Sequence, residues 1–166
     1  MSGTRDRGDQ LRGEILRFLE DTAGRRNWAH KGLRAAIRGL RPDEALWKPE
    51  RGHSVWEQIN HIAYWKRYIL HRTQGKRTRA RQAWPAPGRT AAELNRSIAD
   101  LGALHRELRA AVTGLDPETF DPKGGRYPPA QLLLGEAAHE SYHIGQIFLT
   151  RKLYRSHRRH RGTRSR

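Results

Sequence analysis

Residues 135–153 read GEAAHESYHIGQIFLTRKL and place two histidines, His139 and His143, four positions apart. On an α-helix, residues four apart lie one turn apart on the same face, so both imidazoles point the same way. Leu132 and Ile147 share that face, which therefore should turn toward the protein interior. Two imidazoles at this spacing can chelate one divalent cation, and a pair of hydrogen-bonded core histidines is the structural alternative.

The sequence before this stretch predicts two helical regions joined by connectors. Apolar residues at intervals of three and four predict helix over residues 11–40, with an interruption near Gly24. Ser54 and Glu57 have the spacing of a capping box, which predicts that a second helix begins directly after Ser54. The following basic segment, 75–89, contains two Pro-containing dipeptides and is predicted to be a loop.

Two further helices complete the pattern. Thr90 and Glu93 form a second capping box, and apolar residues then alternate at spacings of four and three, as in a bundle. Pro129 can lie in the first turn of a fourth helix, which we expect to end at about Tyr154. No alternating apolar pattern indicates a strand. The sequence therefore predicts an all-α protein, a four-helix bundle with long connectors between its helices.

The composition sets the domain organisation and the charge. We expect one domain over residues 1–154, with residues 1–9 frayed, and a basic, disordered tail over residues 155–166. The chain has 166 residues and a formal net charge of +16, with arginine spread along its whole length. This charge favours nonspecific attraction to nucleic acid, and a basic solvated surface is the simpler interpretation.

Several classes of protein are excluded by the composition. The chain contains no cysteine, so it has no thiol nucleophile, and any metal must be held by histidine or carboxylate. No apolar run reaches the roughly 18 residues that a membrane span requires. The first ten residues, MSGTRDRGDQ, precede no apolar core of a secretory signal. We therefore expect a cytoplasmic protein with no membrane association.

A metal site with two ligands on one helix needs a third from elsewhere. His61, in the second helix, lies on a flank with Gln58 and Trp65 that can face a neighbouring helix. His105 is a second candidate for the third ligand because it lies on the central apolar face of the third helix. The structural alternative for His105 is a hydrogen-bonded histidine of the core. The remaining histidines are expected in solvent, near element ends or in the tail: His30, His53, His71, His157 and His160.

The five residues from His139 to His143 also match the zinc-protease pattern H-E-x-x-H. Such proteases need a further ligand after the second histidine, and no acidic residue follows His143. Helix geometry rotates Glu140 by about 100° from His139, so Glu140 is expected to support a ligand or to form a salt bridge. The sequence therefore argues against a protease.

Two segments together resemble the DinB-like (DinB/YfiT) superfamily of metal-binding four-helix bundles. They are HSVWEQINHIAYWKRYIL, residues 53–70, and the quoted stretch around His139 and His143. The resemblance covers residues 10–154. It implies three metal ligands, one on the second helix and two on the fourth, which by position are His61, His139 and His143. It also implies a divalent metal, zinc or nickel, and a homodimer.

The resemblance implies a function as well as a fold. The superfamily includes S-transferases that use low-molecular-weight thiols and a mycothiol-dependent maleylpyruvate isomerase. A metal with an open coordination position favours a thiolate over a thiol, which fits such chemistry. A metal-dependent hydrolase and a non-catalytic metal-binding stress-response module remain alternatives, and a basic nucleic-acid-binding protein is a third. The substrate is not identified by these residues.

Overall fold

The structure of the protein is a computed structural model that describes residues 2–24, 31–81, 83–120 and 128–163. Its helices are α1 (Ser2–Ala23), α2 (Leu33–Ala36), α3 (Pro42–Leu46), α4 (Val55–Thr73), α5 (Ala91–Thr113) and α6 (Pro129–Thr163), and a single 3₁₀ turn, η1, covers Pro117–Phe120. No strand is found in these described ranges. The prediction of an all-α protein is therefore confirmed.

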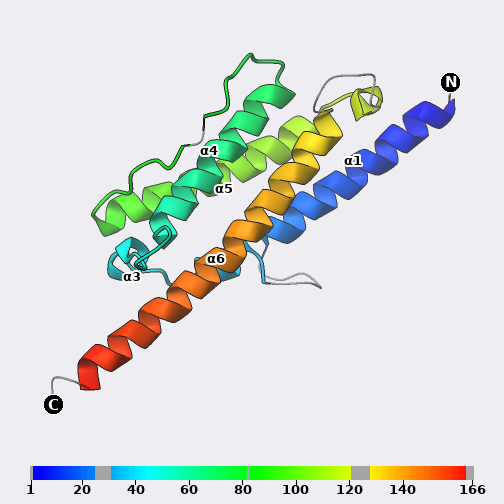
Figure 1. The fold of residues 1–166 in the computed structure, drawn as a ribbon. Helices are drawn as coiled ribbons and strands as arrows, with labels where there is room; N and C mark the ends of the chain where they lie inside the picture. Colours follow the sequence, from blue (N-terminus) through cyan, green and yellow to red (C-terminus); the bar gives the residue numbers. More distant parts are fainter. Residues whose placement is uncertain (1, 25–30, 82, 121–127, 164–166) are drawn as a thin grey trace.

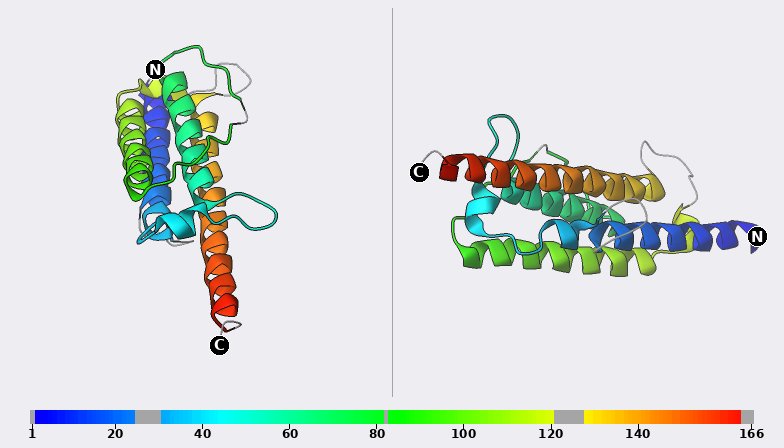
Figure 2. Two further views of the ribbon diagram at one scale, coloured as in Figure 1. Left: turned by 90° about the vertical axis from the view of Figure 1, so that its left-hand side faces the viewer. Right: turned by 90° about the horizontal axis from the view of Figure 1, so that it is seen from below.

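Four long helices, α1, α4, α5 and α6, form the bundle (Figure 1). Helix α4 packs against α5 and α6, and α1 packs against the same two helices from the other side. Helices α1 and α6 run in one direction and α4 and α5 in the other (Figures 1 and 2). Because α4 and α5 are parallel, residues 74–90 must return along the length of the bundle, as in other bundles with a crossover connection.

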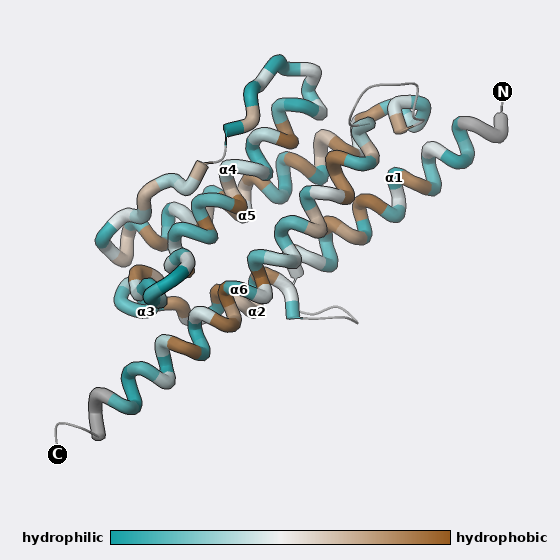
Figure 3. The backbone as a smooth tube through the Cα atoms, viewed as in Figure 1, coloured by the Kyte–Doolittle hydropathy of each residue, from teal (hydrophilic) through white to brown (hydrophobic). Residues whose placement is uncertain are grey.

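The core of the bundle consists of apolar side chains spaced by three and four residues along each helix. Along the backbone, hydrophobic segments alternate with hydrophilic ones (Figure 3). Fully or almost fully buried members are Ile15 and Leu19 of α1, Ile59 and Ile62 of α4, Leu101 and Leu108 of α5, and Leu133 and Ile147 of α6. Burying each such side chain stabilises the fold by roughly 1.5–3 kcal/mol.

Both predicted capping boxes are present. The Ser54 hydroxyl accepts a hydrogen bond from the backbone N–H of Glu57 at 3.1 Å, and the Glu57 carboxylate accepts one from Ser54 N–H at 2.7 Å. Thr90 and Glu93 exchange the same two bonds at 3.2 and 2.9 Å. Because these bonds satisfy N–H groups that lack partners within the helix, they fix where α4 and α5 begin.

Helix α6 is longer than predicted. It continues nine residues beyond Tyr154, to Thr163, and its C-terminal end projects past the bundle (Figure 1). Residues 155–163 are therefore helical, not the disordered tail that we expected. Arginine is a good helix former, and cations near a helix C-terminus interact favourably with the helix dipole. Similarly, α1 is helical from Ser2, within the segment expected to fray.

The long helix α6 also carries large apolar side chains on its surface. Leu134, Tyr142, Leu149 and Leu153 are each exposed by 39% or more. The homodimer implied by the resemblance stays a prediction, and this exposed stripe is the surface of α6 that could meet a second copy. Within the described residues, no helix combines the length and the apolar composition needed to cross a bilayer.

A buried polar cluster lies inside the bundle and joins three helices. The ammonium of Lys66, on α4, lies 3.3 Å from Glu136 and 3.2 Å from Glu140, both on α6, and all three side chains are buried. Thr22, on α1, donates a hydrogen bond to Glu140 at 2.9 Å. Burial disfavours the charge on Lys66, but the carboxylates outweigh it and the pKa of Lys66 is raised.

We expect the substitution Lys66→Met to lower the free energy of unfolding by about 3–5 kcal/mol, because it leaves two buried carboxylates without their cation. Urea denaturation of metal-free protein measures this change. The matched control is the triple variant Lys66→Met, Glu136→Gln, Glu140→Gln, which removes all three charges and should recover most of the loss. A loss below about 1 kcal/mol for the single variant would contradict the ion cluster.

Candidate metal centre

Three histidines from two neighbouring helices converge at one point between α4 and α6. His61 comes from α4, and His139 and His143 lie one turn apart on α6. The Nε2 atom of His139 lies 3.2 Å from that of His61 and 3.1 Å from that of His143. Among the described residues, these three form a group of side chains that could hold a metal ion. The structure therefore brings together the three residues expected from the sequence.

The distances between these nitrogen atoms suit one shared cation. Imidazole nitrogen binds zinc at about 2.0–2.1 Å, which separates two ligand atoms by about 2.9 Å at a right angle and about 3.3 Å at the tetrahedral angle. The observed separations of 3.1 and 3.2 Å fall between these values. The candidate ligand atoms of the three side chains all lie within 4.8 Å of one another, so one divalent cation can contact all three after small movements of the side chains.

A backbone hydrogen bond orients the ring of His61. Its Nδ1 atom lies 2.6 Å from the carbonyl oxygen of Ala83, in the crossover connection. A carbonyl oxygen can only accept, so Nδ1 carries the proton and donates it. The neutral ring then presents the lone pair of Nε2 toward His139. Such a hydrogen bond behind a ligating histidine fixes its tautomer and its direction.

Aromatic rings surround the three histidines. Trp84, in the same connection, is stacked between His61 and His53, with ring centroids 3.9 and 3.4 Å away and interplanar angles of 8° and 4°. Trp65 approaches His139 edge-on at 6.0 Å. These rings replace water beside the site and lower the local dielectric constant, which strengthens electrostatic interactions with any bound ion.

The site is open mainly on the side of His139. The side chain of His139 is 28% exposed, whereas the residues His61 and His143 are only 5% and 3% exposed. A small molecule would therefore approach the cluster past His139, on the side away from the stacked Trp84.

The three imidazoles are held in their neutral form. Burial lowers the pKa of His139 and of His143 to about 4, and charge on the neighbouring imidazoles adds to this effect. Burial also lowers the pKa of His61. Because neutral imidazole is the form that binds a metal, the cluster needs to release no proton at neutral pH before a cation binds.

The buried ion cluster lies directly behind the histidines. Oε2 of Glu136 is 4.0 Å from Nδ1 of His139, too far for a hydrogen bond but close enough for electrostatic attraction. Burial raises the pKa of Glu136 to about 7, against the opposing effect of Lys66. Glu140 is fully buried and pairs with Lys66 instead of facing the imidazoles. Of the two roles expected for Glu140, the salt bridge is confirmed.

The other histidines have separate surroundings. His105 is buried on α5, with Nε2 3.4 Å from the carboxylate of Glu20, and it is not part of the cluster. His53 is half-buried against Trp84, which corrects the expectation that it lies in solvent. His157 and His160 belong to helix α6, and His30 lies outside the described residues.

Some functional residues were missed by reasoning from the sequence. Trp84 and Ala83 were assigned only to a loop, although the Trp-Pro dipeptide in a basic connector marks an aromatic ring that needs burial. Lys66 follows Ile62 by four residues within the apolar face of α4, and this position predicts a buried lysine that requires acidic partners. Glu136 and Glu140, four apart on α6, are those partners.

Comparisons with known proteins agree with this geometry. The family model for the DinB superfamily matches residues 25–147, a range that contains all three clustered histidines, the crossover connection and the buried Lys66. Searches among curated proteins and among solved structures found no significant match. From the family match over most of its length, together with the all-helical fold, the chain belongs to the DinB superfamily.

Proposed function

We propose that this protein binds one divalent cation through His61, His139 and His143 and uses it to activate a low-molecular-weight thiol for transfer to a small molecule. The observation that carries the proposal is the convergence of three Nε2 atoms at separations of 3.1 and 3.2 Å. Zinc and nickel both suit a set of three imidazoles.

The ligand set leaves room for a further ligand. Zinc and similar ions take at least four ligands, and three protein ligands with an open position are typical of catalytic sites. Neutral imidazoles add no negative charge, and the nearby Glu136 and Glu140 are paired with Lys66. The positive charge of a cation would thus be only weakly compensated by the protein, which favours an anionic ligand in the open position.

A thiolate is the anionic ligand that the chain itself cannot supply. The sequence contains no cysteine, so a sulfur nucleophile must come from a separate small molecule. When bound, a divalent cation favours the thiolate over the thiol and holds it beside an electrophile. The chain's own contribution is to orient His61 through Ala83 and to exclude water with Trp84 and Trp65.

Hydrolysis is less well supported by the arrangement of acidic residues. A hydrolase of this kind uses a side chain that accepts a proton from the attacking water. Glu140, which holds that place in the protease pattern, is fully buried and bonded to Thr22 and Lys66. A thiol with a lowered pKa needs no such base. A metal-binding module without turnover would use the same three ligands and is the remaining alternative.

Removing a ligand tests the metal site. We expect protein purified without a polyhistidine tag to hold about one divalent cation per chain. Substituting His61→Ala or His143→Ala should weaken binding at least about 100-fold, a loss of about 2.7 kcal/mol. Elemental analysis and competition with a chromophoric chelator measure this. The matched control is His105→Ala, which removes a buried histidine outside the cluster, and an equal loss in that variant would contradict the assignment.

The lowered pKa values predict how metal binding depends on pH. Imidazoles whose pKa is about 4 stay neutral well below the ordinary histidine value of about 6.5. Since protons compete with the cation for the same nitrogen atoms, and the pKa of His61 is also lowered, zinc affinity should begin to fall only below the ordinary histidine value on acidification from about pH 8 to about 4. Titrations across this range measure it, and a decline that begins near pH 6.5 would contradict the lowered pKa values.

Thiol binding is tested on cobalt-substituted protein. We expect N-acetylcysteine or glutathione to produce a near-ultraviolet sulfur-to-cobalt absorption band, because the thiolate enters the open position. N-acetylserine, with oxygen in place of sulfur, should give no such band, and His143→Ala should abolish it. If cobalt binds but neither thiol alters the spectrum, the S-transferase proposal fails and the non-catalytic module is favoured.

A further inference from the structure

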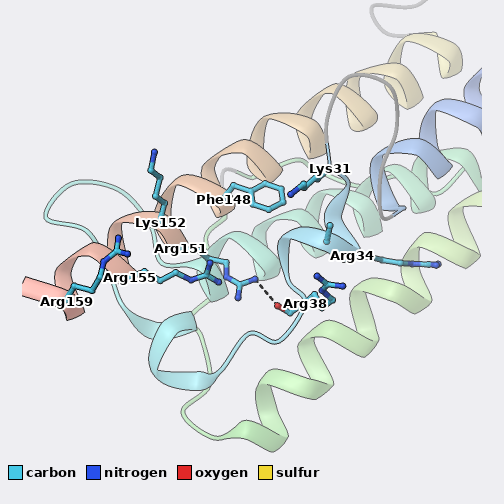
Figure 4. Close-up of a pocket in the computed structure, with 9 residues that line it drawn as sticks. Lys31, Arg34, Arg38, Phe148, Arg151, Lys152, Arg155 and Arg159 are labelled. Carbon is cyan, nitrogen blue, oxygen red and sulfur yellow. Dashed lines mark hydrogen bonds between the residues drawn. The ribbon is translucent and has the colours of Figure 1, made fainter. Parts of the chain in front are cut away.

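A basic groove of about 770 Å³ lies between the C-terminal half of α6 and the segment around α2 (Figure 4). Seven of its nine lining residues are lysine or arginine: Lys31, Arg34, Arg38, Arg151, Lys152, Arg155 and Arg159. The other two are Ala35 and Phe148, and the described lining includes no acidic side chain. Glu44 pairs with two of these cations, Arg151 and Arg155, and the excess of positive charge around the hollow favours an anionic partner.

This groove is separate from the metal centre. Phe148 follows His143 by five residues on α6, and at about 100° per residue it lies roughly 140° around the helix. His143 turns toward α4, whereas Phe148 and Lys152 line the groove toward α2. The two surfaces therefore occupy different sides of α6, and a partner in the groove would not contact the imidazoles.

One buried arginine holds the two walls of the groove together. Arg151 donates hydrogen bonds to both carboxylate oxygens of Glu44, at 2.8 and 3.1 Å, and to the carbonyl oxygen of Ala36. It also donates one to the carbonyl oxygen of Arg38, which Figure 4 shows. These bonds tie the end of α2 and helix α3 to α6. Arg151 is thus structural, and its bonds fix the segments that carry the other basic residues relative to one another.

The groove continues at both ends along α6. A hollow of about 280 Å³ shares Lys31 and Phe148 with it and reaches back to Ser141. Another, of about 370 Å³, shares Arg155 and Arg159 and adds Arg41 and Arg158, and its lining also includes Glu44. Here Arg155 lies 3.4 Å from Glu44, and Arg41 and Arg158 lie 3.4 and 3.5 Å from Asp43. Apart from Lys31, the hollow that reaches Ser141 is lined by uncharged residues. The lining cations of α6 extend from Arg151 to Arg159, over which the helix rises by about 12 Å. The basic surface is therefore an elongated strip, and the partner should be elongated too.

We propose that this strip binds the phosphodiester backbone of double-stranded DNA without reading its sequence. A DNA strand presents one phosphate per about 3.4 Å of helix axis, so a strip of this length faces several successive phosphates. Most of the lining cations are arginines, whose planar guanidinium forms paired hydrogen bonds with phosphate oxygens. This interaction is independent of the metal-dependent activity proposed above.

Other anionic partners fit the groove less well. A small phosphorylated molecule would contact only a few of the cations along the strip. An anionic membrane surface is bound by helices that present protruding apolar residues beside their charges. Here the apolar residue that lines the groove beside the cations, Phe148, is half-buried. The exposed Leu149 and Leu153 lie roughly 100° and 140° around α6 from it, so they protrude on a different side of the helix.

Charge reversal tests the groove. In the full-length chain, Arg38→Glu with Lys152→Glu removes two groove cations, and Lys76→Glu with Arg106→Glu is the matched control. Both pairs replace one exposed arginine and one exposed lysine, so the net charge changes equally. Fluorescence anisotropy with a short labelled duplex, across a series of salt concentrations, measures binding. Circular dichroism melting checks that each variant is folded. The pair Arg38→Lys with Lys152→Arg conserves both charges and tests whether positive charge at these positions is enough for DNA binding.

We expect the groove pair to weaken DNA binding at least about tenfold and to reduce the slope of log K against log salt by about 2, one unit per lost phosphate contact. The control pair and the charge-conserving pair should retain most of the affinity. Equal losses in the groove and control pairs would overturn the proposal in favour of diffuse net charge. Binding of anionic vesicles or of ATP that depends on the groove, with DNA binding unchanged in the groove pair, would overturn it in favour of those ligands.

Discussion

The packing of α4 against α6 around buried Lys66 is the constraint on which the rest of the structure depends. Lys66 can remain charged inside the bundle only with Glu136 and Glu140 beside it. That requirement fixes the position of α4 along α6. His61 precedes Lys66 by five residues, and His139 and His143 follow their neighbouring glutamates by three, so the same alignment brings the imidazoles together.

The crossover connection orients one of the clustered histidines and covers part of the site. Because α4 and α5 are parallel, residues 74–81 and 83–90 of the connection pass along the outside of the bundle (Figures 1 and 2). On the way, the carbonyl of Ala83 fixes the tautomer of His61, and Trp84 covers its ring. A direct turn between antiparallel helices could provide neither contact. The topology of the bundle therefore supplies the support behind one ligand and the apolar cover over the site.

Helix α6 contributes residues to two separate surfaces, the histidine cluster and the basic groove. Its inward side carries the metal-ligand candidates His139 and His143 and the glutamates that pair with Lys66. Another side, lined by Phe148 and Lys152, forms the basic groove that Arg151 braces against Glu44. A rigid helix presents each residue on a fixed side. A reaction at His139 and His143 and an anionic partner in the groove would therefore not compete for the same surface.

The amino-acid sequence by itself determined the all-helical fold, the starts of α4 and α5, and the shared helix face of His139 and His143. The capping boxes at Ser54 and Thr90 and the spacing of His139 and His143 follow from local geometry, which a linear pattern records. Which distant histidine completes the cluster depended on the helix packing, because His61 and His105 both lie on faces that could turn inward. Only the tertiary structure decided between them. It alone placed Ala83, Trp84 and the groove lining, since these contacts join residues far apart in the chain and leave no periodic signal.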